Sequence, residues 1–162
     1  MQKGFSSDGF ITDQDYFGDY PYRAMTSDIN GCGWMAAYDL RRALGQDAEF
    51  DDVRRQMDAM FLLRIPGPTT MAVMLRYLRL YIDDFSLVRG RAAVLSAAPR
   101  ARAGILRYTE SGIPHFAAFV NVSGDVFRFF NVADGLEDCR FHMAEFILYR
   151  CKRGCVRAIL VF

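Results

Sequence analysis

The sequence has few of the features that mark several classes of protein. It contains only two lysines, and its 18 arginines stand singly or in pairs, so no basic run indicates a surface for nucleic acid or membranes. Charge is balanced, with a net value of +1. No apolar stretch approaches the roughly 18 residues of a membrane-spanning helix, and the opening MQKGFSSDGF lacks the apolar core of a signal peptide. We therefore expect a cytoplasmic protein with no membrane span and no nucleic-acid partner.

The residues that are plentiful favour one folded domain over residues 1–162. Apolar residues make up 52% and aromatic residues 14%, which argues against disorder. Residues 1–27, rich in Gly, Asp, Ser and Tyr, predict an irregular N-terminal arm. The four cysteines are expected to be free thiols. Cys151 and Cys155 lack the two further ligands of a zinc site, so we expect no metal and no organic cofactor.

The chain changes near residue 103 from helical to strand-type patterns. Apolar residues at helical spacing predict helices over 33–44, 50–61, 69–81 and, more briefly, 90–98. Strand-type runs then occupy 103–109, 114–122 and 125–132, with a tight turn at 123–125, and a helix over 142–151 and a strand over 156–162 follow. Helices followed by an antiparallel sheet are typical of an α+β fold. In the first helix we expect Asp39, Arg41 and Arg42 to face solvent and Gly45 to end the helix.

Cys32 lies between Gly31 and Gly33 where the first helix is predicted to begin. The helix dipole and free N–H groups at such a position favour the thiolate, which is the nucleophilic form. The two glycines would let the backbone approach a substrate carbonyl, and the Cys32 N–H would face an oxyanion. Trp34 would add an apolar surface beside this cleft. The alternative interpretation is a buried cysteine that only fills space at a turn.

A thiolate nucleophile needs a base, and the chain has two histidines. His115 begins a predicted strand, where side chains reach a cleft, whereas His142 is expected to be a solvated surface residue. Asn131 ends the next strand, and the intervening hairpin turn predicts that it lies beside His115. Its amide would then hold the imidazole in one tautomer. Asp134, three residues further on, is the alternative orienting residue.

Three stretches, NGCGWMAAYDLRRALG, IPHFAAFVNV and FRFFNVADG, resemble the papain-like cysteine peptidase superfamily. The similarity is greatest to the compact bacterial domains related to bacteriocin-processing, double-glycine peptidases. In that superfamily the nucleophilic Cys begins the central helix, the His begins a sheet strand, and an Asn or Asp closes the next strand. Cys32, His115 and Asn131 match this order. The resemblance implies a papain-like α+β fold, with the Cys-bearing helix packed on a C-terminal antiparallel sheet, and a peptide or protein substrate.

One position departs from the superfamily pattern. A Gln six residues before the Cys usually completes the oxyanion hole, and Thr26 stands at that position here. Asn30 is the nearest amide donor, so Asn30 and the Cys32 N–H are the candidate oxyanion donors. Loss of one such donor costs roughly 10²–10³ in rate. The sequence therefore predicts a thiol hydrolase, most simply a peptidase. Acyl transfer or deamidation on the same fold, and a binding module with a retired site, are the alternatives.

Overall fold

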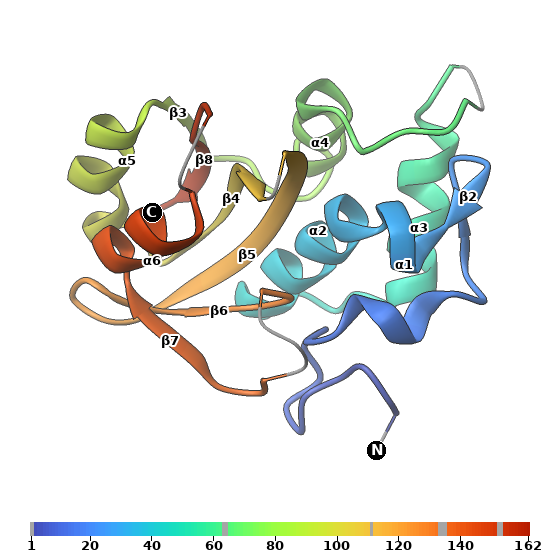
Figure 1. The fold of residues 1–162 in the computed structure, drawn as a ribbon, viewed down its shortest axis with the longest axis horizontal. Coiled ribbons are helices and arrows are strands. Elements are labelled where there is room, and N and C mark those ends of the chain that lie inside the picture. Colours follow the sequence, from blue (N-terminus) through green and yellow to red (C-terminus); the bar gives the residue numbers. More distant parts are fainter. Residues whose placement is uncertain (1, 63–64, 111, 133–135, 152–153) are drawn as a thin grey trace.

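The structure is a computed structural model that describes residues 2–62, 65–110, 112–132, 136–151 and 154–162. The described residues form a mixed fold in which helices pack on both faces of a six-stranded antiparallel sheet (Figure 1). In spatial order the strands are β3 (Ser86–Arg89), β8 (Arg157–Val161), β4 (Ala103–Glu110), β5 (Ile113–Ser123), β6 (Val126–Phe129) and β7 (Cys139–His142). The expected combination of helices and an antiparallel sheet is confirmed at this level.

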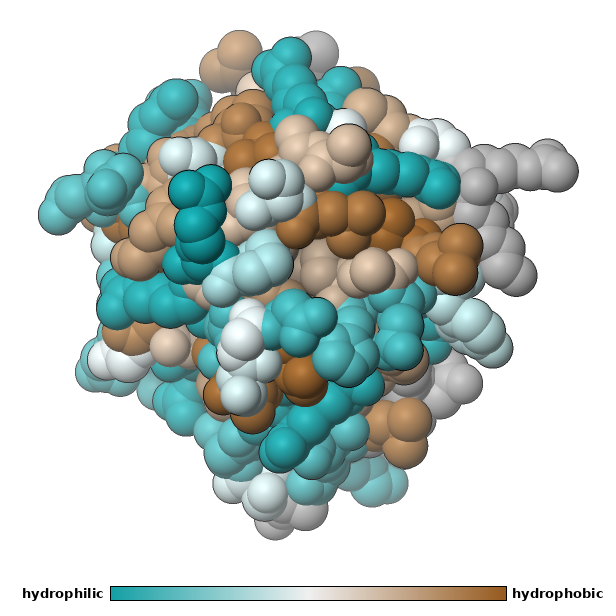
Figure 2. Space-filling view, turned by 90° about the vertical axis from the view of Figure 1, so that its left-hand side faces the viewer, coloured by the Kyte–Doolittle hydropathy of each residue, from teal (hydrophilic) through white to brown (hydrophobic). Residues whose placement is uncertain are grey.

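Alternate residues of the sheet point into two separate cores, as the two-residue period of a strand requires. Ile105 and Phe116 pack in the core under α2 (Cys32–Ala43), α3 (Phe50–Ala59) and α4 (Met71–Leu78). Leu106 and Phe119 pack in the opposite core, under α5 (Arg91–Ala97) and α6 (Met143–Arg150). The face that carries α5 and α6 mixes apolar and hydrophilic side chains on its surface (Figure 2). The helix α2 thus lies against β4 and β5, between the sheet and α3.

Most predicted elements are present, with shifted ends. The helix predicted over 69–81 spans Met71–Leu78. It begins at Met71 because the Thr70 side chain accepts a hydrogen bond from the Val73 N–H at 3.2 Å and caps the helix. Gly45 follows α2 with φ +74°, the left-handed conformation expected of a residue that ends a helix. Two edge strands, β3 and β7, were not predicted. Both have four residues, too few to show a clear alternation.

The N-terminal arm is ordered and contributes to the core. It contains a short 3-10 helix, η1 (Gln14–Phe17), and a small hairpin of β1 (Pro21–Tyr22) and β2 (Met25–Thr26) that precedes α1 (Ser27–Asn30). Ile11 and Tyr22 are fully buried. Phe10 stacks on Phe130 with ring centroids 4.1 Å apart, which fixes the arm against the sheet. The arm is therefore irregular, as predicted, but it is an integral layer over α2.

Two charged residues expected to face solvent are buried. Asp39 has no exposed surface, and its Oδ1 accepts a hydrogen bond from the Ile11 N–H at 2.8 Å. Arg41 is 9% exposed and donates from Nη1 to the Tyr77 hydroxyl at 2.9 Å. The prediction was wrong because it treated α2 as a surface helix, whereas the arm covers one side and α4 another. No helix in the described ranges is long and apolar enough to cross a membrane.

Candidate active site

Cys32 begins α2 at an interruption in the helical hydrogen bonding. The Gly31 N–H donates to the Ser27 carbonyl at 2.8 Å and closes α1, and the Met35 N–H donates to the Gly31 carbonyl at 3.1 Å in the first turn of α2. The Asp28 carbonyl, which Cys32 would use in a continuous helix, accepts from the Gln14 side chain at 2.7 Å. The Cys32 N–H belongs to the first turn of α2, whose main-chain N–H groups have no partner within that helix. An N–H group at a helix N-terminus can face a developing negative charge.

The glycines on both sides of Cys32 are required by packing. A Cβ at Gly31 would lie 2.9 Å from Cε of Met35 and closer still to the Ser27 carbonyl. A Cβ at Gly33 would lie 2.7 Å from Cγ2 of Thr69, with Cβ and Oγ1 of Thr69 closer. Both glycines are buried, so they do not form an open wall of a cleft as predicted. They allow α1 and the segment before α4 to close around the start of α2.

The imidazole of His115 lies beside the thiol of Cys32, and its orientation is fixed from the other side. His115 Nε2 is 3.0 Å from the main-chain oxygen of Asn131. A carbonyl oxygen only accepts, so Nε2 must carry a proton, and Nδ1 is the basic nitrogen in the neutral ring. The Tyr108 ring packs edge-on against the imidazole at 5.4 Å between centroids. The ring is therefore held in one tautomer with its second nitrogen free to exchange a proton.

The surroundings of His115 favour its charged form. Burial by itself lowers the pKa of this imidazole, but hydrogen bonding to Cys32 and the charge on that sulfur raise it. The Asn131 carbonyl and the Glu110 carboxylate raise it further, so the pKa of His115 lies above its ordinary value. An imidazolium favoured beside a sulfur is the partner that a thiolate needs.

Asn131 reaches His115 through its backbone rather than through the predicted side-chain amide. Its φ is +56°, a left-handed conformation that Asn tolerates and that turns its carbonyl to the ring. The side chain points the other way, donating from Nδ2 to Oε1 of Gln14 at 3.1 Å and approaching Sδ of Met35 at 3.7 Å. Asp134, the alternative orienting residue, lies outside the described residues. Sequence reasoning missed Gln14, because no local motif marks it.

Asn30, the second candidate oxyanion donor, is held by the segment that precedes α4. Its side chain is almost buried and donates from Nδ2 to the Gly67 carbonyl at 3.0 Å. Tyr22 is a hydroxyl donor that the sequence did not suggest, and its Oη lies 2.9 Å from Oγ1 of Thr69. Burial, together with charge on Cys32 and Asp58, raises the pKa of Tyr22, so the phenol stays protonated near the sulfur. Of the two predicted oxyanion donors, the Asn30 amide thus donates to Gly67, and the Cys32 N–H is the remaining candidate.

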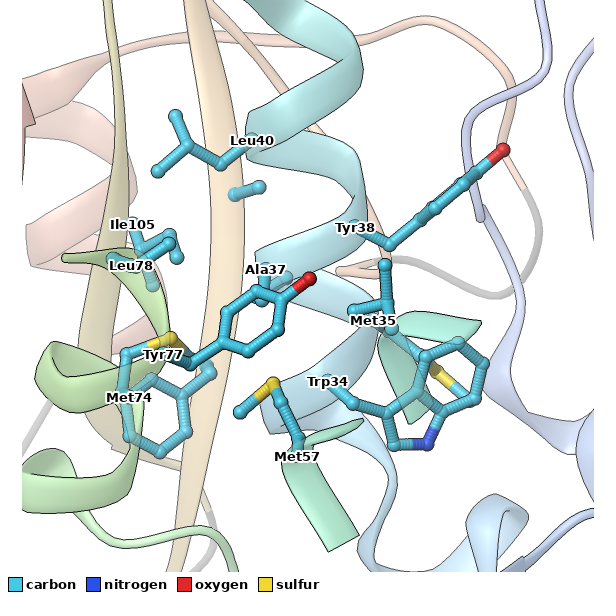
Figure 3. Packing of buried hydrophobic residues seen from close by; sticks show 14 of the residues in the cluster. Trp34, Met35, Ala37, Tyr38, Leu40, Met57, Met74, Tyr77, Leu78 and Ile105 are labelled. Carbon is cyan, nitrogen blue, oxygen red and sulfur yellow. The ribbon is translucent and has the colours of Figure 1, made fainter. Parts of the chain in front are cut away.

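Trp34 belongs to the core and does not line a cleft as predicted. It has no exposed surface, and its indole N–H donates to Oγ of Ser27 at 3.1 Å. Figure 3 shows Trp34 together with Met35 and Met57 inside the hydrophobic cluster. The indole packs edge-on against Phe17, with ring centroids 5.6 Å apart. Its role is to anchor the first turn of α2, since Ser27 belongs to the preceding helix.

The other three thiols differ from Cys32 in their surroundings. All four cysteines are free. Burial raises the pKa of Cys139 and raises that of Cys151 to about 12, so neither is a ready nucleophile. Cys155 is exposed. No group of three or more His, Cys, Asp or Glu side chains in the described ranges is arranged to hold a metal ion.

Comparison of the sequence with known proteins does not assign a family. No family model matches the chain, and no curated protein matches it. Two segments far apart in the sequence nevertheless meet at one place, the start of α2 and the start of β5. The residues around Cys32 are therefore the ones that indicate a function.

Proposed function

We propose that the protein is a cysteine-dependent hydrolase that cleaves peptide or related amide bonds, with a papain-like arrangement of helix and sheet. The observation that carries this proposal is the imidazole of His115 beside the thiol of Cys32, at the start of helix α2. A nucleophile, a base with a fixed tautomer and an oxyanion donor are the parts that acyl transfer through a thioester needs. The packing of α2 against β5 supports the papain-like assignment.

In the proposed mechanism the Cys32 thiol gives its proton to Nδ1 of His115, and the sulfur attacks the substrate carbonyl carbon. The Cys32 N–H donates to the oxyanion that forms. The imidazolium then protonates the leaving amine, and the carbon–nitrogen bond breaks to leave a thioester on Cys32. Water, deprotonated by His115, attacks this thioester, releases the acid and returns the thiol. Throughout, the Asn131 carbonyl accepts from Nε2 and stabilises the imidazolium.

Burial strengthens these interactions. Cys32 is 4% exposed, and Tyr108 closes the side of the imidazole away from solvent. Charge interactions in such a water-poor site exceed those at the surface. The raised pKa of His115 suits a general acid, since the ring holds its proton until an amine leaves.

The first test compares thiol reactivity within one molecule. The folded protein is treated with iodoacetamide at about pH 6, and the labelling rate of each cysteine is followed by peptide mass spectrometry. Cys155 is the exposed reference thiol in the same molecule. We expect Cys32 to react faster than Cys155 and to slow at least tenfold in His115→Ala. The matched control, His142→Ala, removes the only other histidine and should leave Cys32 unchanged.

Equal rates of Cys32 labelling in wild type and His115→Ala would remove the base from the proposal.

The second test identifies the reaction by product mass after incubation with a defined peptide library. Addition of water to a peptide indicates hydrolysis, loss of ammonia indicates deamidation, and a new conjugate indicates acyl transfer. Cys32→Ser should abolish product formation while the unfolding transition stays cooperative.

A further inference from the structure

A groove of about 320 Å³ lies between the end of α3 and α4, close to the start of α2. The walls that described residues form are apolar apart from Arg23 and Arg76. The residues that define this arginine groove are Arg23, Met60, Phe61, Ile65, Val73 and Arg76. Between residues 59 and 82 the sequence contains no Asp or Glu. The groove therefore combines apolar walls with positive charge, which suits an anionic ligand that also carries apolar groups.

The buried guanidinium of Arg23 has no carboxylate within ion-pair distance among the residues that the structure describes. It is 7% exposed, stacks on the Phe61 ring at 3.8 Å, and donates from Nη1 to the Gly67 and Pro68 carbonyls at 3.1 and 2.7 Å. Its Nε is buried with no acceptor in the described part of the chain. The nearest carboxylate contact, from Asp58, is to the main-chain N–H of Arg23 at 2.8 Å and not to the guanidinium. A buried positive charge is costly, and an anion bound in the groove that Arg23 lines would offset this charge.

The backbone at Arg23 is also held in a costly conformation. Arg23 and Ala24 have φ of +51° and +59° in the turn between β1 and β2. Such turns are normally occupied by Asn and Gly, because other residues are strained there. Strain of this kind is often found where a side chain must be aimed at a ligand. Here it directs a guanidinium into the wall of the groove.

The arginine groove and Cys32 share one segment of chain. The Gly67 carbonyl accepts hydrogen bonds from both Arg23 and Asn30, at 3.1 and 3.0 Å. Two residues later, Thr69 packs against Gly33, which follows Cys32 in α2. The groove and the start of α2 are thus joined through residues 67–69.

We propose that the arginine groove binds a peptide bearing a carboxylate next to an apolar side chain. The carboxylate pairs with Arg23 and Arg76, and the apolar side chain packs on Phe61 and Val73. This inference rests on the proposed function in making the groove a substrate subsite of Cys32, although binding can be measured without turnover. An acidic side chain and a free C-terminus offer the same carboxylate chemistry, and the test separates them.

The test uses the full chain with Cys32→Ser, so that bound peptide is not turned over. Three N-acetylated peptides Ala-Leu-X-Leu-Ala are titrated by NMR: X is Glu with a C-terminal amide, X is Gln with an amide, or X is Gln with a free carboxylate. We expect one carboxylate peptide to bind about tenfold tighter than the Gln amide, with an advantage that shrinks as salt is added. Tighter binding of the Glu amide assigns the site to acidic side chains, and tighter binding of the free acid assigns it to C-termini. Equal affinities for all three peptides would overturn the proposal.

Charge variants locate the binding. Arg76→Ser should reduce the affinity for the favoured peptide about tenfold, to that of the Gln amide. Arg79→Ser is the matched control, because this exposed arginine caps the same helix outside the groove and should change the affinity less than about twofold. If a second variant, Arg23→Gln, does not fold, the Arg76→Ser variant still tests the proposal. If a carboxylate peptide binds more tightly but His115→Ala leaves the labelling of Cys32 unchanged, only the proposed function is refuted. If the labelling of Cys32 depends on His115 but all three peptides bind equally, only the proposal for the groove is refuted.

Discussion

The substitution Gly33→Ala tests the contact that positions the candidate nucleophile. In an open helix this change would stabilise the protein by up to about 1 kcal/mol, because alanine has the higher helix propensity. Here the added Cβ would lie 2.7 Å from Cγ2 of Thr69 and closer to the rest of that side chain. Thr69 is 2% exposed and cannot swing into solvent without disturbing its neighbours.

The cost follows from what Thr69 must give up. Overpacking of a buried site costs about 1–3 kcal/mol. If Thr69 moves instead, its 2.9 Å hydrogen bond with the buried Tyr22 hydroxyl is lost, at about 1–3 kcal/mol. With the middle of these ranges, about 2 kcal/mol, and a gain in helix propensity of up to about 1 kcal/mol, the net loss of stability should be about 1–2 kcal/mol. Urea unfolding measures it through the fluorescence of Trp34, which is the only tryptophan and is fully buried.

The control is Gly45→Ala, at the other end of α2. A Cβ there meets nothing within 4 Å, but the backbone has φ +74°, so the change costs about 1–2 kcal/mol through strain alone. Both variants should therefore lose similar stability, whereas only Gly33→Ala should slow the labelling of Cys32. A Gly33→Ala protein as stable as the wild type, with unchanged Cys32 labelling, would refute the reasoning.

Three further predictions address the groups around the site. An NMR titration should give His115 a pKa above its ordinary value, and Cys32→Ala should lower this pKa, since burial then acts with less opposition. Burial disfavours the charged carboxylate of Asp39 and so raises its pKa. The contribution of this group to stability is therefore fully present below the unfolded pKa of about 3.9, and it is lost as the pH rises and the carboxylate ionises. Asp39→Asn should accordingly gain stability over wild type in urea unfolding between about pH 4 and pH 8. Gln14→Ala should cost about 1–2 kcal/mol in the same assay, for two hydrogen bonds, and should slow Cys32 labelling.

The elements that the sequence predicted are those whose signals are local. The helix that starts at Cys32 has an apolar side at helical spacing and a glycine after its last turn. The hairpin of β5 and β6 has alternating residues and a short turn at 123–125. The juxtaposition of His115 and Asn131 followed from that hairpin, because antiparallel pairing returns the second strand to the start of the first.

The features that the sequence did not predict depend on contacts between distant segments. Asp39 looked like a solvent-facing residue because helical periodicity cannot show that Ile11 will cover it. Trp34 looked like a cleft residue because its hydrogen bond to Ser27 forms only when α1 folds back on α2. The backbone role of Asn131 depends on a left-handed φ, which residue type permits but does not specify.

Gln14 links the two reactive groups through a single amide. Its Oε1 accepts from the Asn131 side chain, and the Asn131 carbonyl in turn accepts from the ring of His115. Its Nε2 donates to the Asp28 carbonyl, the acceptor that the Cys32 N–H would use if α1 and α2 were continuous. The same side chain therefore holds both Asn131, which orients the base, and the Asp28 carbonyl in the helix before Cys32. Loosening the N-terminal arm should disturb base and nucleophile together, because both hydrogen bonds end on one residue.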